Sequence, residues 1–390
     1  MSGDVISLGC RLNIAESETI RSLLAGEDNT IVVNSCAVTA EAVRQTRQAI
    51  RRARRQSPDA RLLVTGCAAD IERDTIAAMP EVDGIIANTA KLDPRAWNVP
   101  APARPAAKQR TRAFIAVQNG CDHSCTFCII PQGRGKSRSL PVRQVLDEIE
   151  LALDHGAPEI VLTGVDLTSW GHDLPGSPRL GALASATLRQ FPQLGRLRMS
   201  SLDGIEIDAE LFDLFAGEPR LMPHLHLSLQ SGDDLTLKRM KRRHLRRDAV
   251  KLVESLRQRR PDITIGADLI AGFPTETDEM HRNNHSIISE LAIVHGHIFP
   301  YSIRPGTPAA LMPQVNRSII KERAAALRDE VTRVRTGWLQ GLIGQPLSVL
   351  TEKDGTGHAE NFARVKVPDD IAPGTLVSIT PSQLHEGLLA

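Results

Sequence analysis

Aromatic residues are scarce in this chain of 390 residues: they make up 3% of it, and there is a single tyrosine. Binding of nucleic acid mainly by stacking of bases on aromatic side chains is therefore not expected. The formal net charge is +1, from 47 basic and 46 acidic side chains. A charge so near zero does not attract the whole molecule to nucleic acid, so any such binding must depend on local basic surfaces.

Long apolar runs are also missing. The N-terminal segment MSGDVISLGC has no basic stretch followed by an apolar run, so a signal peptide is not expected. No segment reaches the roughly 20 apolar residues that a membrane-spanning helix needs. We therefore expect a cytoplasmic protein without a membrane partner. In a reducing compartment the six cysteines are better explained as metal ligands or reactive thiols than as three disulfides, which remain the alternative.

The length predicts two or three domains, and a hydrophobic content of 41% is sufficient for their cores. The first hundred residues alternate short apolar runs with helical patterns, which predicts a parallel sheet with helical crossovers. The proline- and alanine-rich segment 93–107 is interpreted as a linker. The expected strands of this first domain are 5–8, 30–33, 61–64 and 84–87, and its expected helices are 15–24 and 41–55.

A second alternation predicts six βα units, which can form an open partial barrel with its chemistry at the C-terminal ends of the strands. A long charged helix over 316–340 follows, and then short strands with glycine and proline turns predict a small all-β, OB-like module. The fold class is α/β, with domains expected at 1–95, 108–335 and 343–390. The expected barrel strands are 113–117, 159–162, 197–200, 224–229, 263–269 and 293–299, with a helix at 142–155, and those of the module are 347–351, 362–367 and 376–379.

Three cysteines, Cys121, Cys125 and Cys128, form a CxxxCxxC motif directly after a predicted strand. Three thiolates on one tight loop can hold three irons of a 4Fe–4S cubane and leave the fourth iron open. Zinc is the alternative metal, but a structural zinc site needs a fourth protein ligand, and His123 inside the loop is poorly placed for that role.

This spacing, with Phe127 before the last cysteine, resembles the radical S-adenosylmethionine (SAM) superfamily. The resemblance implies that the central domain is a radical SAM barrel. It also implies that the open iron binds the methionine end of SAM and that an electron cleaves SAM to a 5′-deoxyadenosyl radical. Ordinary turn chemistry is the alternative reason for polar residues and glycines after the strands. The residues expected to contact SAM are Phe127, Gly164, Asp166, Ser228, Gln230, Asp268 and Gly272.

The other cysteines, Cys10, Cys36 and Cys67, each follow one of the first three predicted strands. The ends of parallel strands emerge along the same edge of a sheet, so the three thiols should converge. They could then hold a second cluster with its own open iron. Small buried core residues are the alternative, since free cysteine is often buried.

With both trios, the resemblance covers nearly the whole chain and narrows to the methylthiotransferases, which carry a three-cysteine N-terminal domain, a radical SAM barrel and a C-terminal β module called TRAM. It implies two 4Fe–4S clusters. It also implies two uses of SAM, as methyl donor and as radical source, in converting a C–H bond to C–SCH3. No side chain is needed as a general acid or base, so no catalytic residue is predicted.

Three subfamilies modify isopentenyladenosine in tRNA, threonylcarbamoyladenosine in tRNA, or an aspartate of a ribosomal protein. The segments SLGCRLN, NSCAVT and VTGCA look most like the threonylcarbamoyl group. Arg11 and Leu12 stand where the isopentenyl group has glutamine and methionine and the ribosomal group has proline and lysine. The implied function is methylthiolation of C2 of N6-threonylcarbamoyladenosine at position 37 of tRNA. The other two substrates, and an RNA-binding iron–sulfur scaffold without catalytic activity, remain alternatives.

Two basic clusters, within 44–61 and within 238–247, fit tRNA as a partner together with the OB-like module, because Lys and Arg supply phosphate contacts without reading sequence. A solvated helix face is the alternative for each cluster. The resemblance adds a flavodoxin- or ferredoxin-like electron donor and leaves the sulfur donor unidentified. The residues expected to bind RNA are Arg51, Arg54, Arg55, Lys136, Arg138, Lys241 and Arg242.

Overall fold

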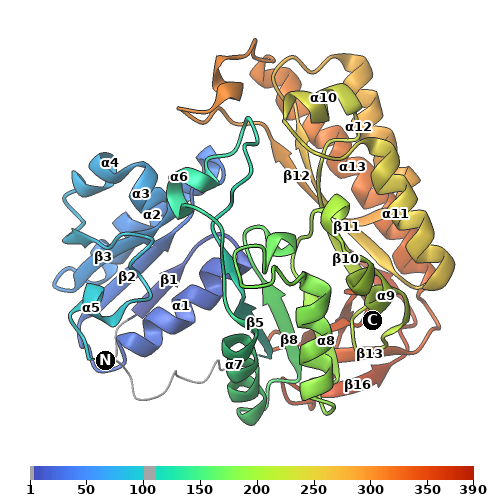
Figure 1. The fold of residues 1–390 in the computed structure, drawn as a ribbon, viewed down its shortest axis with the longest axis horizontal. Coiled ribbons are helices and arrows are strands. Elements are labelled where there is room, and N and C mark those ends of the chain that lie inside the picture. Colours follow the sequence, from blue (N-terminus) through green and yellow to red (C-terminus); the bar gives the residue numbers. More distant parts are fainter. Residues whose placement is uncertain (1–3, 101–110) are drawn as a thin grey trace.

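The N-terminal part of the molecule is a four-stranded parallel sheet in the order β1-β2-β3-β4, as predicted. It lies on the blue side of Figure 1, which shows a computed structural model that describes residues 4–100 and 111–390. The elements are β1 (Asp4–Ser7), α1 (Arg11–Leu23), β2 (Thr30–Ser35), α2 (Ala40–Gln56), β3 (Arg61–Gly66), α3 (Cys67–Ile71), α4 (Arg73–Ala77), β4 (Gly84–Ile85) and α5 (Pro94–Trp97).

Two of these elements differ from the sequence prediction. Helix α1 begins four residues earlier than expected, because Asn13 and Glu16 are polar but buried and so interrupt the apolar pattern. The interpretation of 93–107 as a linker is wrong at its start. There, the Asp93 carboxylate caps the backbone N–H of Arg95, and Trp97 is buried in the core. The rest of that segment, from residue 101, lies outside the described residues.

The central part is the predicted open barrel of parallel strands. Strands β5, β8 and β9 form one sheet and β10, β11 and β12 another, and parallel bridges from Leu197 to Leu221 and from Leu202 to Leu227 join them. The strands are β5 (Arg112–Ala116), β8 (Glu159–Thr163), β9 (Arg196–Met199), β10 (His224–Gln230), β11 (Thr264–Ala271) and β12 (Ile293–Pro300). A β-ribbon of β6 (Gln118–Asn119) and β7 (Arg138–Ser139) lies between β5 and the helix at Val142–Asp154.

Alternation along the strands separates an apolar outer face from a polar inner face. Outward residues such as Ile160, Leu197 and Ile265 form the main core with the surrounding helices, while polar and charged residues alternate with them toward the interior. The helices are α6 (Ile130–Arg134), α7 (Val142–Asp154), α8 (Leu180–Gln190), α9 (Ala209–Gly217), α10 (Asp234–Arg239), α11 (Arg246–Arg259), α12 (Asp278–Glu290) and α13 (Arg317–Gly341), with short 3-10 turns at Leu167–Ser169, Gly204–Glu206 and Pro308–Leu311.

The C-terminal part is the predicted all-β module, a single sheet in the order β16-β13-β14-β15-β18-β17. The strand expected at 362–367 is shorter, because Phe362 has a φ of +70° and lies in the turn before it. None of the helices in the described part of the chain is long and apolar enough to cross a membrane. The strands are β13 (Leu347–Thr351), β14 (Thr356–Ala359), β15 (Arg364–Lys366), β16 (Leu376–Ile379), β17 (Leu384–His385) and β18 (Leu388–Leu389).

This module closes the end of the barrel at which the strands begin, and it does so with Phe362. The Phe362 ring stacks on the His224 imidazole with 4.9 Å between centroids, and the Arg198 guanidinium lies 4.9 Å from the ring centre. The Arg196 guanidinium also donates to the Ser348 Oγ at 2.9 Å. The polar floor of the barrel is therefore completed by residues of another domain.

Candidate functional site

The loop that carries Cys121, Cys125 and Cys128 follows β6 and is fixed by a glycine. Gly120 has a φ of +76°, and a Cβ at this position would lie 2.0 Å from the backbone oxygen of Lys136. Only glycine fits such a close approach of two backbone segments. The loop is therefore held against the strand-like segment that returns after α6.

Hydrogen-bond donors point at each sulfur of this trio. The backbone N–H groups of His123 and Ile130 lie 3.4 Å from the Cys121 Sγ and 3.5 Å from the Cys128 Sγ. The Nη1 of Arg242 lies 3.7 Å from the Cys125 Sγ. Such donors stabilise negative charge on sulfur, which is the form that binds iron.

The thiols themselves are poor acids in this setting. Burial raises the pKa of Cys121 to about 12, with Asp166 and the neighbouring sulfurs adding to the shift. Burial likewise raises the pKa of Cys128 to about 11. A bound cation would reverse this, because metal binding deprotonates its thiol ligands. All six cysteines are free, so the disulfide alternative is wrong.

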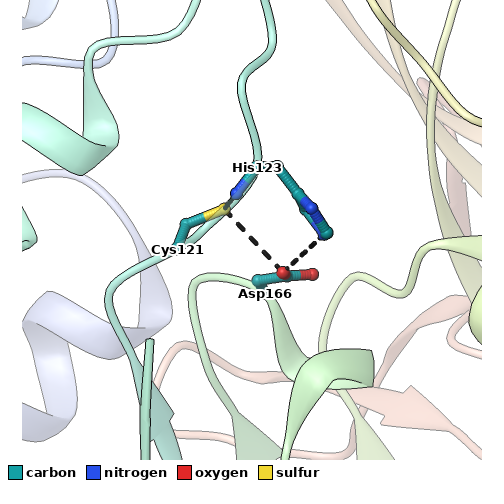
Figure 2. A group of neighbouring side chains, drawn as sticks. All are labelled: Cys121, His123 and Asp166. Atoms are coloured by element: carbon teal, nitrogen blue, oxygen red, sulfur yellow. Dashed lines mark hydrogen bonds and ion pairs between the residues drawn. The ribbon is translucent and has the colours of Figure 1, made fainter. Parts of the chain in front are cut away.

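Asp166 faces the loop from the end of β8 (Figure 2). Its Oδ2 lies 2.8 Å from the His123 Nε2, 3.8 Å from the Cys121 Sγ, and accepts from the Ser169 Oγ at 2.7 Å. The Asp166 and Glu206 carboxylates, as acceptors for the His123 imidazole N–H, stabilise its protonated form more than burial destabilises it and raise its pKa to about 10. The site thus presents a carboxylate and an imidazolium at one side of the cysteine loop.

The second trio lies along the C-terminal edge of the N-terminal sheet. Cys10 precedes α1, Cys36 follows β2, and Cys67 is the first residue of α3 after β3. Gly9 packs so closely that a Cβ there would lie 2.6 Å from the Cys36 Sγ. Burial raises the pKa of Cys36 to about 11, and the charges of the Cys10 and Cys67 sulfurs raise it further. The three thiols are therefore electrostatic neighbours.

Helix α6 connects the two trios. It begins two residues after Cys128 and packs on α3 (Figure 1), where a Cβ on Gly133 would lie 3.4 Å from the Cβ of Cys67. The Asn88 Nδ2 donates to the backbone oxygen of Gly133 and lies 3.8 Å from the Cys67 Sγ. One short segment therefore contacts a ligand candidate of each trio.

A buried charge network fastens this junction, and sequence reasoning did not find it. Both Glu16 carboxylate oxygens bond the Arg134 guanidinium, at 2.9 and 3.1 Å, and the Lys91 Nζ lies 2.6 Å from the same carboxylate. The three side chains are between 1% and 3% exposed. Burial opposes ionisation of Glu16, but Lys91 and Arg134 outweigh it and lower its pKa. The sequence shows only that polar residues such as Glu16 interrupt the apolar face of α1.

Most residues expected to contact SAM lie at strand ends around the cysteine loop. Gly164 follows β8, Ser228 and Gln230 end β10, and Gly272 follows β11 with a φ of +71°. The Phe127 ring packs edge-on against Phe273 with 6.3 Å between centroids.

Asp268 is different, because β11 runs on to Ala271 and so includes it. Its Oδ1 is 3.1 Å from the His226 Nε2 and 3.0 Å from the His297 Nδ1, on the inner face of the barrel. Asp268 therefore lies before the end of its strand, whereas Gly272 follows that end.

The residues expected to bind RNA fall into two groups. Arg51, Arg55, Lys136, Arg138 and Lys241 are exposed. Arg54 donates to the backbone oxygens of Pro58, Ala60 and Glu81 and pairs with Asp83, and so joins the end of α2 to the sheet. The Arg242 side chain is 8% exposed and bonds Asp203 at 3.0 Å. A run of basic residues in the sequence does not show which of them are exposed and which have partners inside the protein.

Comparison with known proteins identifies the family. The Radical SAM superfamily matches residues 115–284, and the Uncharacterized protein family UPF0004 matches residues 4–87. Threonylcarbamoyladenosine tRNA methylthiotransferase MtaB of Rickettsia prowazekii (strain Madrid E) is 44% identical, over 99% of this chain and 96% of that protein. The chain belongs to the radical SAM tRNA methylthiotransferases.

Another relative of this methylthiotransferase is less similar. tRNA-2-methylthio-N(6)-dimethylallyladenosine synthase of Erythrobacter litoralis (strain HTCC2594) is 31% identical over 96% of this chain and 93% of that protein. Among solved structures, the radical SAM methyltransferase TsrM from Kitasatospora setae is 16% identical, with a TM-score of 0.54 over 76% of this chain and 67% of that one. The likeness to TsrM shows the fold.

The residues fit the cofactors of this methylthiotransferase family, SAM and 4Fe–4S clusters. Soft thiolate donors suit iron–sulfur clusters, and each trio offers three of them without a fourth cysteine. Family membership also sets aside the alternative of a scaffold without catalytic activity.

Proposed function

We propose that this chain methylthiolates C2 of N6-threonylcarbamoyladenosine at position 37 of tRNA, using two 4Fe–4S clusters. The observation that carries the proposal is the contact of α6 with both cysteine trios, because chemistry shared by two clusters requires them to face one site. The relatives named for this nucleoside, at 44% and 32% identity over nearly the whole chain, support the choice of substrate.

In this proposal Cys121, Cys125 and Cys128 hold one cluster and Cys10, Cys36 and Cys67 hold the other. When bound, the cofactors would supply the one-electron chemistry that breaks an unactivated C–H bond. They would also supply the sulfur and the methyl group that replace the hydrogen. The chain's own residues do the rest. Asp166 offers a carboxylate for the amine of SAM, and Phe127 with Phe273 excludes water from one side of the loop.

The exposed basic residues are the proposed contacts for tRNA phosphates. Arg51 and Arg55 on α2 and Lys136, Arg138 and Lys241 near the cysteine loop would contribute affinity without reading sequence. Because Arg54 and Arg242 have partners inside the protein, we propose that they act in positioning instead. A tRNA substrate and a low-potential reductant of the flavodoxin or ferredoxin kind are both found in the cytoplasm, which is the proposed location.

The substrate is tested by digesting tRNA from a strain that lacks this gene and measuring modified nucleosides by mass spectrometry. We expect loss of the methylthio form of threonylcarbamoyladenosine and its return when the gene is restored. Loss of the methylthio form of isopentenyladenosine instead would assign the enzyme to the other tRNA substrate, and no change in either would refute both.

The division of labour between the trios gives a second test. Replacing Cys125 by alanine should abolish reductive cleavage of SAM to 5′-deoxyadenosine. Replacing Cys36 by alanine should leave cleavage within about twofold of wild type and stop formation of the methylthio product. Both activities are measured on anaerobically reconstituted protein. Equal loss of cleavage in the two variants would contradict separate roles.

A further inference from the structure

At the inner side of the barrel, Arg11 is a cation without a hydrogen-bond or ion-pair partner among the described residues. Helix α1 packs through Ile14 and Ala15 on Phe114 and Val161, which lie on the inward face of β5 and β8. Arg11, at the start of the same helix, holds its guanidinium 5.6 Å from the centre of the Phe362 ring. Within residues 4–100 and 111–390, its side chain forms no hydrogen bond or ion pair.

The inward-facing arginines around it are all satisfied. Arg112 pairs with Glu352 at 2.7 Å, and Arg198 binds both oxygens of Glu159 at 2.9 and 3.2 Å. Arg196 bonds Ser348. Among these inward-facing arginines, Arg11 is therefore the one whose guanidinium N–H groups have no acceptor within the described residues.

The charges near Arg11 do not supply a partner either. Arg112 and Arg198 repel it, and the attracting carboxylates of Glu159 and Asp268 are already engaged by Arg198 and by two histidines. A half-buried guanidinium beside two like charges is unfavourable unless an anion joins it. The geometry therefore points to a binding position for a carboxylate or similar anion.

The proposed substrate carries such a group. The N6 substituent of threonylcarbamoyladenosine ends in a threonine carboxylate, whereas the isopentenyl group is an apolar chain. We propose that the Arg11 guanidinium binds this carboxylate and thereby selects the threonylcarbamoyl nucleoside over adenosines with an uncharged N6 substituent. This inference rests on the proposed function, and it names the residue that reads the substrate.

The position of Arg11 agrees with the reacting atom. In adenine, C6 and C2 are both bonded to N1, so the N6 substituent and C2 share one edge of the base. Arg11 directly follows Cys10, a member of the trio proposed to serve the sulfur step. Holding the carboxylate at Arg11 would keep the C2 edge beside that trio.

The test uses reconstituted enzyme and two anticodon stem-loop RNAs, one with threonylcarbamoyladenosine and one with its methyl ester. Wild type should bind the free acid about tenfold to a hundredfold more tightly than the ester, as expected for a charge-assisted bidentate contact. Arg11→Gln should bind both RNAs alike, near the affinity of wild type for the ester. Arg11→Lys should recover part of the preference, because it restores the charge.

Arg21→Gln is the matched control, since Arg21 lies on the same helix but is exposed and bonds the Val5 backbone oxygen. This variant should keep the preference for the acid. Equal affinity of wild type for acid and ester would overturn the inference without needing a variant that folds. So would an Arg11→Gln protein that still prefers the acid, or one that weakens both RNAs equally. A wild-type enzyme that methylthiolates a different nucleoside would instead refute the proposed function.

Discussion

At the scale of single residues, Arg242 shows how burial changes the role of a basic side chain. Its guanidinium lies between the Cys125 Sγ at 3.7 Å, the Ser228 backbone oxygen at 2.9 Å and the Asp203 Oδ2 at 3.0 Å. A positive charge beside a cluster ligand favours the reduced, more negative form of the cluster. We therefore propose that Arg242 acts by position and charge on the cluster that Cys121, Cys125 and Cys128 are proposed to hold.

Replacing Arg242 by glutamine should make the midpoint potential of this cluster more negative, by on the order of tens of millivolts, because the stabilising charge is lost. An EPR-monitored redox titration measures the shift. Lys241→Gln serves as the control, since Lys241 is the exposed neighbour and should leave the potential unchanged. The same shift in both variants would show that the effect is only one of overall charge.

Gly120 is the second residue with a sharp consequence. Alanine there would bring a Cβ to 2.0 Å from the Lys136 backbone oxygen, at a φ of +76°. Gly120→Ala should therefore lose the neighbouring cluster and reconstitute with about four irons instead of about eight. Gly195→Ala, which meets no atom within 4 Å, should keep the full iron content. A full complement in Gly120→Ala would contradict the rigidity inferred for this loop.

The sequence allowed the six cysteines to be proposed as cluster ligands because their signal is local. Three of them sit at a fixed spacing, and the other three each follow a strand. Arg134 and Glu16 could not be found, because their contact joins residues 118 positions apart. The role proposed for Arg11 could not be predicted either, because its lack of a hydrogen-bond or ion-pair partner depends on residues that are distant in the sequence, such as Arg198 and Phe362.

At the scale of elements, the junction of α1 and α6 carries a buried triad of Glu16, Lys91 and Arg134. Glu16→Gln would leave two buried cations without their carboxylate, which should cost about 3–5 kcal/mol of unfolding free energy. Thermal unfolding should show a melting temperature lower by several degrees. Adding Arg134→Met should restore part of the loss, because it removes one unpaired charge. A melting temperature within one degree of wild type would contradict the role of this junction.

Element boundaries were predictable where apolar alternation governs them. The six barrel strands and three strands of the C-terminal module, β13, β15 and β16, were expected within a few residues of their observed positions. The short strands β14, β17 and β18 were not predicted. The errors occur where polar residues are buried, as at the start of α1, or where a side chain serves another domain, as at Phe362. Those features depend on tertiary partners that a local pattern does not contain.

At the scale of the whole molecule, the floor of the barrel predicts a dependence of stability on pH. Burial and the charge of Arg335 lower the pKa of His295 to about 3, and this imidazole lies 5.4 Å from the Phe362 ring centre. Between pH 6.5 and 3, His295 is protonated in the unfolded state but stays neutral in the folded state. Stability should therefore fall as the pH falls, by about 1.4 kcal/mol per pH unit for this group.

The prediction is checked by chemical denaturation of wild type and His295→Phe at pH 7, 6 and 5, at matched iron content. The unfolding free energy of the variant should fall less with falling pH than that of wild type. The difference in slope should be at most that of one bound proton, about 1.4 kcal/mol per pH unit. Comparing slopes removes any constant effect of the substitution on packing. Parallel curves for the two proteins would show that His295 is not the group responsible.

The floor also has a consequence for biosynthesis. Ribosomes deliver a chain from its N-terminus, so the barrel strands emerge before the residues that cover their lower end. The Ser348 partner of Arg196 is made 152 residues later, and Phe362 later still. A prematurely terminated product would keep its arginines and imidazoles uncovered, as a substrate for cellular proteases. The lower end of the barrel thus stays open until Ser348 and Phe362 have been translated.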